Sequence, residues 1–236
     1  MFALFQYDFA IRALIGGLAL SVIAPSIGLF LLTRRYAFMA DTLSHVSLAG
    51  VVIAAVLGLP YLIPVLVLDI AAALTVEKIR RSGRAFGDGA LALFLSGSLA
   101  LASVLISANR GLGFNLSAVL FGSITTVSSE DVVLILILGA VVFLCIAMFF
   151  REFFALSLDE ELAEGSGLRV TLFSTILITL AAITVALALR VVGALLVGAL
   201  MVIPPLSAMQ WPVSFKNTLI ISIFTALVSV LVGLPL

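Results

Sequence analysis

Long apolar segments recur along the whole chain and constrain its fold more than any other feature. A bilayer's hydrocarbon core is about 30 Å thick, so a helix that rises about 1.5 Å per residue needs about 20 apolar residues to cross it. The sequence therefore predicts an all-α polytopic membrane protein, a single transmembrane domain over residues 1–236 with about eight spans. The expected spans are about 10–32, 37–58, 61–79, 88–108, 131–150, 170–189, 191–209 and 217–236.

Composition supports a membrane protein and excludes other classes. Hydrophobic residues make up 64% of the chain and charged residues 10%, and the mean hydropathy is +1.38. A soluble domain is only about half apolar. The formal net charge is zero, so nothing indicates a nucleic-acid partner. The one cysteine, Cys145, excludes an internal disulfide and is expected to be a buried apolar residue.

Two segments leave the topology open. The spans at 170–189 and 191–209 are separated only by Arg190, so they form either a tight hairpin or one long broken helix. The stretch "LSAVLFGSIT" at 116–125 is too short to cross a membrane. It predicts a short interfacial or re-entrant helix on the outer side.

Basic residues set the predicted orientation, because cytoplasmic loops carry the excess of lysine and arginine. They concentrate after the first, third and fifth spans, so these loops are expected to be cytoplasmic. This places the N-terminus outside, unless residues 1–9 form a short interfacial helix. The residues concerned are Arg34, Arg35, Lys78, Arg80, Arg81, Arg84, Arg151 and Arg169.

The second span carries two ionisable residues in "MADTLSHVSLAG", Asp41 and His45. Residues four apart share a helix face, about 5–6 Å apart at Cβ. An ionised carboxylate at membrane depth costs about 2.5–3.5 kcal/mol, so it needs a partner. Zinc, manganese or iron would suit an oxygen and a nitrogen ligand. Alternatively, His45 hydrogen-bonds Asp41, Ser44 or Ser47 in a packed bundle.

Two ligands leave such a metal ion under-coordinated, because zinc takes about four. The others could come from water, from a third residue, or from a second copy of the chain across a two-fold axis. Asp69, in "VLVLDIAAAL", is expected at a depth near that of His45. It could be a third ligand, a proton relay, or the partner of a hydroxyl or of Arg190.

The longest loop expected in the cytoplasm, "REFFALSLDEELAEGSGLR" at 151–169, predicts a short acidic helix at about 157–167. Ser157 and Glu160 have the spacing of a capping box. Gly165 is expected to stop the helix in a left-handed conformation. A helix this short is marginal in water, so it should pack against a partner protein or serve as a connector.

Four segments together resemble the permease subunits of bacterial ATP-binding-cassette importers for zinc, manganese or iron. Their order along the chain is the family's order. They are "TRRYAFMADTLSHVSLAGV" at 33–51, "LSAVLFGSITTVSSEDV" at 116–132, "LDEELAEGSGL" at 158–168 and "VVGALLVGALMVIPPLSA" at 191–208.

The resemblance implies a multi-pass permease of the bacterial cytoplasmic membrane that moves zinc or manganese. It implies a second permease copy, a separate cytoplasmic ATPase that binds ATP, and an extracytoplasmic metal-binding protein, which Glu130 and Asp131 could help to dock. No cofactor of its own is expected. Asp41 and His45 match the family's metal site. The resemblance assigns ATPase coupling to Ser157, Asp159, Glu160, Glu161, Leu162, Ala163, Gly165 and Gly167.

Other classes remain open from the residues alone. A proton-coupled secondary transporter could use Asp41, His45 and Asp69 as a relay. A purely structural subunit would need none of them. A membrane enzyme is disfavoured, because the sequence contains no HExxH motif and no phosphate-binding GxxxxGK[ST] motif. ATP hydrolysis is therefore expected on another chain.

Overall fold

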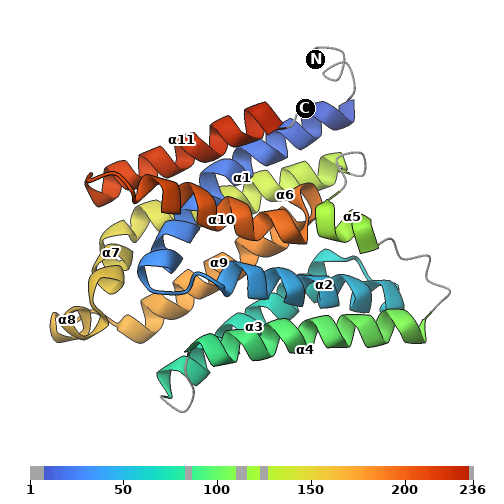
Figure 1. Ribbon diagram of the computed structural model, residues 1–236, viewed down its shortest axis with the longest axis horizontal. Coiled ribbons are helices and arrows are strands. Elements are labelled where there is room, and N and C mark those ends of the chain that lie inside the picture. The colour runs from blue at the N-terminus through green and yellow to red at the C-terminus, as the bar shows by residue number, and fades with distance from the viewer. Residues whose placement is uncertain (1–7, 83–86, 110–115, 123–126, 234–236) are drawn as a thin grey trace.

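The computed structural model describes residues 8–82, 87–109, 116–122 and 127–233, and in these residues the regular structure is entirely helical (Figure 1). The helices are α1 (Asp8–Thr33), α2 (Met39–Leu57), α3 (Leu62–Arg81), α4 (Gly87–Ala108), α5 (Leu116–Phe121), α6 (Ser129–Met148), α7 (Phe150–Leu158), α8 (Glu160–Gly165), α9 (Val170–Val192), α10 (Ala194–Ala208) and α11 (Phe215–Gly233). Residues 1–7, most of the short helix considered at 1–9, lie outside the described residues.

The predicted all-α membrane fold with about eight transmembrane helices is confirmed. Six helices are long and apolar enough to cross a bilayer: α1, α2, α4, α6, α9 and α11. The 20-residue α3 also has the length, but charged residues fill its last turn. The shortest of the eight is α10, with 15 residues. Of the two predicted short helices, the interfacial one corresponds to α5, six residues long, and the cytoplasmic one predicted at about 157–167 corresponds to the shorter α8. The helix α7, which precedes α8, was not predicted.

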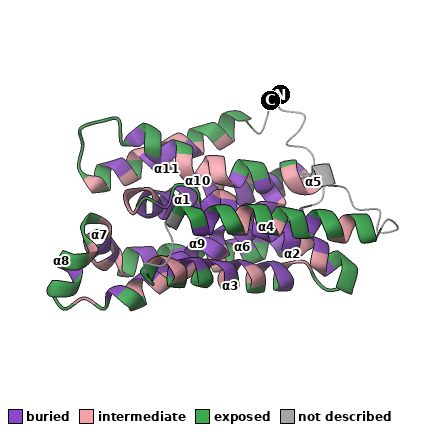
Figure 2. Cartoon of the chain, turned by 60° about the horizontal axis from the view of Figure 1, so that its bottom comes forward, coloured by how far each residue is buried: buried purple, intermediate pink, exposed green. Residues whose placement is uncertain are grey.

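Burial separates central helices from peripheral ones (Figure 2). Side chains of α1 and α9 are buried along most of both helices. By contrast, α4, α6 and α11 expose large apolar side chains, for example Leu93, Ile137 and Ile220. A soluble protein rarely exposes apolar patches of this extent. We expect these outer faces to contact lipid.

Two glycines let helices meet backbone to backbone. A Cβ atom on Gly28 of α1 would lie 1.8 Å from the carbonyl oxygen of Met201 in α10. A Cβ atom on Gly50 of α2 would lie 2.8 Å from the Cα atom of Val65 in α3. Small residues permit such close approach between membrane helices. These contacts fix α2 and α10 within the bundle.

A tight hairpin about Gly193 joins α9 and α10. Near the start of α9, Ser174 accepts a hydrogen bond from Arg34, just after α1, and near its end Val191 packs on Gly16. The next helix, α10, returns along α1 through the Gly28 contact (Figure 1). The φ of +85° at Gly193 favours glycine. Of the two arrangements predicted, the hairpin is confirmed, with its turn three residues after Arg190.

Charges gather at one end of the bundle, which we call the inner end. Arg34, Arg80 and Arg81, from two loops predicted to be cytoplasmic, meet α8 and the start of α9 there. Arg190 lies at the opposite, outer end, near the start of α6. This separation agrees with the orientation predicted from the basic loops, which we adopt below.

We predict that Gly28→Ala destabilises the fold, because the added methyl group must displace the α10 backbone. Forced overpacking costs about 1–3 kcal/mol. Thermal unfolding in detergent should show a lower midpoint for Gly28→Ala. The matched control is Gly97→Ala in α4, where a Cβ atom meets nothing within 4 Å. Equal midpoints for the two variants would contradict the close contact of α1 and α10.

Candidate metal site

The candidate site lies near the inner end of α2, where Asp41 and His45 share one face. The distance from His45 Nε2 to Asp41 Oδ1 is 3.9 Å, which is too long for a hydrogen bond. His45 Nδ1 is buried and has no hydrogen-bond partner among the described residues. The Asp41 side chain is 45% exposed. The pair is thus brought together by the helix but left with unused bonding capacity.

Neighbouring serines do not satisfy His45. The hydroxyl of Ser44 donates to the carbonyl of Ala40 at 2.8 Å, within α2. The hydroxyl of Ser47 donates to Asp69 Oδ2 at 2.5 Å. The alternative in which either serine hydrogen-bonds His45 is therefore wrong for this structure.

The helix α10 borders the pair without filling the space beside it. A Cβ atom on Gly198 would lie 3.8 Å from the Asp41 backbone, in ordinary van der Waals contact. Pro204 and Pro205, about two turns further along α10, are both buried. The backbone of α10 therefore lies close to Asp41 at Gly198, while the Asp41 side chain remains partly exposed.

One chain supplies too few ligands for a closed metal site. Within the described ranges, no group of three or more His, Cys, Asp or Glu side chains is placed to hold a metal ion. Asp41 and His45 together offer a carboxylate and a nitrogen, about half the set that zinc takes. A metal ion held here needs ligands from water or from another chain.

Asp69 is fully buried on α3, opposite α2. Its Oδ2 atom accepts the Ser47 hydroxyl, and its Oδ1 atom has no partner in the part of the chain that the structure describes. Ser47 lies two residues after His45, so the predicted similarity in depth holds. Of the roles considered for Asp69, partner of a hydroxyl is the one observed. The structure does not group Asp69 with Asp41 and His45 into a three-ligand site.

At the outer end, Asp131 forms the centre of a buried cluster. It accepts hydrogen bonds from Arg190 at 3.1 Å and from Tyr61 at 3.2 Å, and the Arg190 guanidinium lies over the Tyr61 ring. Asp131 also completes a capping box with Ser128 at the start of α6. The Asp131 carboxylate is thus buried and occupied within the chain, and its expected use in docking another protein stays a prediction. Glu130 is exposed.

The predicted capping of the short cytoplasmic helix is wrong. Ser157 belongs to α7 and donates to the Phe153 carbonyl. The N-cap of α8 is Asp159, which accepts from the backbone N–H groups of Glu161 and Leu162. An ionised side chain receives these bonds strongly, so Asp159 is the better cap. The left-handed glycine is Gly167, with φ +88°, and Gly165 is the last residue of α8.

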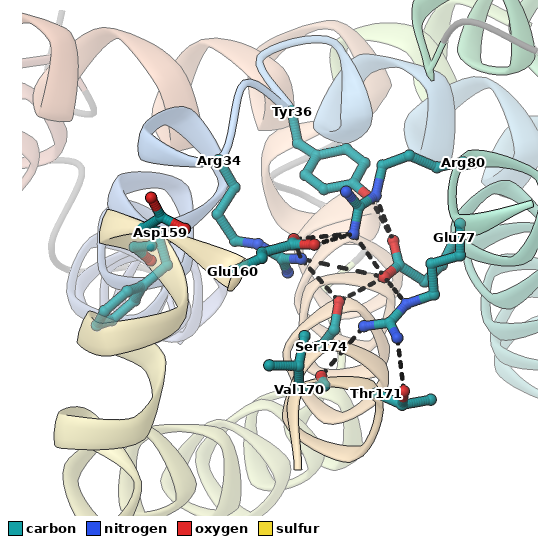
Figure 3. A network of polar contacts seen from close by, with 12 residues as sticks. Arg34, Tyr36, Glu77, Arg80, Asp159, Glu160, Val170, Thr171 and Ser174 are labelled. Carbon is teal, nitrogen blue, oxygen red and sulfur yellow. Dashed lines mark hydrogen bonds and ion pairs between the residues drawn. The ribbon is translucent and has the colours of Figure 1, made fainter. Parts of the chain in front are cut away.

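Two acidic residues at the inner end, Glu77 and Glu160, accept hydrogen bonds from most of the arginines there (Figure 3). We call this set of Arg34, Tyr36, Glu77, Arg80, Arg81, Glu160 and Ser174 the inner cluster. Glu77, at the end of α3, accepts from Tyr36, Ser174, Arg80 and Arg81. Glu160, the first residue of α8, accepts from Arg34 and Arg80.

The electrostatics of the inner cluster favour fixed protonation states. Burial and the Glu77 carboxylate raise the pKa of the Tyr36 hydroxyl, so Tyr36 remains the hydrogen-bond donor. Burial also raises the pKa of Glu160, but Arg34 and Arg80 outweigh it and lower that pKa overall. Sequence reasoning used these arginines only for topology. Their clustering beside Glu77 was the signal that could have revealed the cluster.

Comparisons with known proteins agree with this architecture. Residues 6–236 match the ABC 3 transport family. "Manganese transport system membrane protein MntC" of Listeria monocytogenes is 30% identical over 98% of this chain and 82% of the relative. "High-affinity zinc uptake system membrane protein ZnuB" of Haemophilus influenzae is 27% identical over 98% and 88%.

A solved structure, "PsaBC from Streptococcus pneumoniae in complex with Fab", gives a TM-score of 0.85 at 28% identity, covering 98% of this chain and 83% of that one. The chain belongs to the ABC 3 transport family. The predicted class, a multi-pass permease of metal-ion importers in the cytoplasmic membrane, is thereby confirmed.

We predict that Ser47→Ala destabilises the bundle, because it leaves the buried Asp69 carboxyl without its donor. An unsatisfied buried polar group costs about 1–3 kcal/mol. Thermal unfolding in detergent measures this cost. The control is Ser44→Ala, which removes only a bond to its own helix. A midpoint for Ser47→Ala no lower than that of the control would contradict the assigned role of Asp69.

Proposed function

We propose that this chain forms the membrane pathway of an ATP-driven importer that moves manganese or zinc into the cytoplasm. The observation that carries the proposal is the Asp41–His45 pair. An imidazole nitrogen that is buried without a partner in the described part of the chain shares one face of a membrane helix with an exposed carboxylate. Intramembrane ionisable groups are costly, so unpaired ones mark substrate pathways.

A second copy of the chain completes the site in this proposal. Two copies across a two-fold axis supply two carboxylates and two imidazoles. This number matches the ligands of zinc, which takes about four. Closed two-fold dimers are the commonest oligomers. The exposure of Asp41 beside Gly198 supports a site that opens toward another chain.

The chemistry of the Asp41 and His45 ligands favours first-row divalent metal ions as the cargo. Carboxylate oxygen suits manganese, and imidazole nitrogen suits zinc. The relatives named above are a manganese and a zinc system. A transport site must also release its ion, so binding has to be weak in at least one state. A site divided between two copies weakens when the copies separate.

Energy for this movement comes from a separate ATPase. Membership of the ABC 3 transport family supports this assignment, because the sequence itself contains no phosphate-binding GxxxxGK[ST] motif. We assign the ATPase contact to the inner end, at α8, and the delivery of metal by an extracytoplasmic binding protein to the outer end. ATP-driven motion at α8 then alternates access to the Asp41–His45 pair.

We predict that Asp41→Ala and His45→Ala each abolish accumulation of one metal. The test uses cells that lack their own high-affinity uptake and express the permease with its ATPase and binding protein. Elemental analysis measures the metal, and co-purification of the ATPase checks assembly. Metal uptake like that of the wild type by both variants would contradict the proposal.

Asp69→Asn is the matched control for this experiment. It removes an intramembrane carboxylate but can still accept the Ser47 hydroxyl. Uptake should be retained, because Asp69 is not grouped with the pair. Loss of uptake in Asp69→Asn as well as in Asp41→Ala and His45→Ala would instead favour a proton relay that includes all three residues.

A further inference from the structure

The side chain of Glu160 ties α8 to the transmembrane bundle. Of the three glutamates in α8, Glu160 is the one whose carboxylate contacts the bundle in the described structure. It accepts from Arg34, just after α1, and from Arg80 in α3 at 2.9 and 3.1 Å (Figure 3). Glu161 and Glu164 point to no such partner and are exposed. One carboxylate therefore joins α8 to two helices.

The buried charge of Arg34 is neutralised mainly by the Glu160 carboxylate. The Arg34 side chain is only 2% exposed, and its Nε and Nη1 atoms have no partner within the described ranges. Its Nη2 atom donates to Glu160 and, at 2.8 Å, to the Ser174 hydroxyl. The other nearby acid, Glu77, lies 4.0 Å away. A buried guanidinium that loses its carboxylate is strongly unfavourable, so the pair is expected to move together.

The turn after Arg34 leads directly to the metal pair. Tyr36 N–H donates to the Leu31 carbonyl of α1 at 2.8 Å, and Met39 N–H, at the start of α2, donates to the Tyr36 carbonyl at 3.0 Å. Arg35, immediately before Tyr36 in sequence, adopts a left-handed φ of +63°. The turn is thus bonded to both helices rather than slack. Asp41 follows Met39 by two residues.

Aromatic packing joins α7 to the same end of α1. The ring of Phe30 contacts Phe150 and Phe153 edge-on, each with 5.8 Å between ring centroids. Such pairs add about 0.5–1.5 kcal/mol beyond the burial of their area. Since α8 follows α7 after the single residue Asp159, a displacement of α8 is carried to α1 by two separate contacts.

We propose that the Arg34–Glu160 ion pair is a positioning link that transmits movement of α8 through the 34–38 turn to α2 and its Asp41–His45 pair. This rests on the proposed function, because it assumes that an ATPase acts on α8. Glu160 and Arg34 bind no metal here. They determine whether motion at the inner end reorients the residues that do.

The test is Glu160→Gln in the complete complex with ATPase and binding protein, reconstituted into vesicles. Glutamine keeps the shape and one acceptor but removes the charge. We expect ATP hydrolysis and assembly to be retained, and manganese or zinc moved per ATP to fall at least fivefold, since coupling free energies correspond to about 5- to 150-fold effects. Unchanged transport per ATP, or loss of ATPase binding, would overturn the link.

Glu164→Gln is the matched control, since it removes the same charge from the same helix without touching the bundle. Complexes of this variant that assemble with the ATPase should move as much metal per ATP as the wild type, and co-purification measures separately any effect on ATPase binding at α8. A fall equal to that of Glu160→Gln would overturn the specific role of Glu160. Arg34→Lys provides a second variant, which keeps the buried charge but loses the guanidinium geometry, and it should also uncouple.

A readout without metal separates this proposal from the proposed function. Phe38, the N-cap of α2, is 62% exposed, so Phe38→Cys in a Cys145→Ala background reports on the turn. Its labelling rate by a water-soluble thiol reagent should change between ATP-free and vanadate-trapped complexes. Adding Glu160→Gln should abolish that change. If the change persists, the link is wrong even if metal transport is confirmed.

Discussion

A carboxylate inside a membrane bundle must be given partners, and this requirement organises the whole structure. Asp69 receives a serine hydroxyl, and Asp131 receives a guanidinium and a phenol. Glu77 receives two arginines, a tyrosine and a serine. Within the described residues, Asp41 is the one of these four acids without a hydrogen-bond donor, and the His45 imidazole lies 3.9 Å away. An ionised carboxylate at membrane depth is costly, so the lack of such a partner for Asp41 suggests that its site is incomplete within one chain.

Close contacts at glycine residues determine where α2, and with it Asp41, lies in the bundle. Gly50 brings α2 against α3, and Gly28 seats α10 on α1, so α10 passes Asp41 at Gly198. The candidate site therefore lies on a helix that is held by close backbone contacts. The hydrogen-bonded turn after Arg34 leads into this helix from the inner end. This placement, with the Asp41 side chain partly exposed, is compatible with the proposed site between two copies of the chain.

The sequence predicted those features that depend on local composition. Apolar length predicted the helices, and four-residue spacing placed Asp41 and His45 on one face. It could not predict which acid pairs with which base, because such pairs join distant segments: Arg34 with Glu160, or Arg190 with Asp131. The misplaced cap at Ser157 has a local reason. A chain that already continues as α7 leaves Ser157 inside a helix, and Asp159 caps the next one.

The central claim is that two copies of this chain complete one metal site. Its most direct test is the stoichiometry and ligation of Mn²⁺ bound to the purified complex, by metal analysis together with electron paramagnetic resonance. The account predicts one Mn²⁺ per two permease copies, with nitrogen couplings from two imidazoles that disappear in His45→Ala. One ion per copy, a single imidazole, or binding that survives His45→Ala would contradict it.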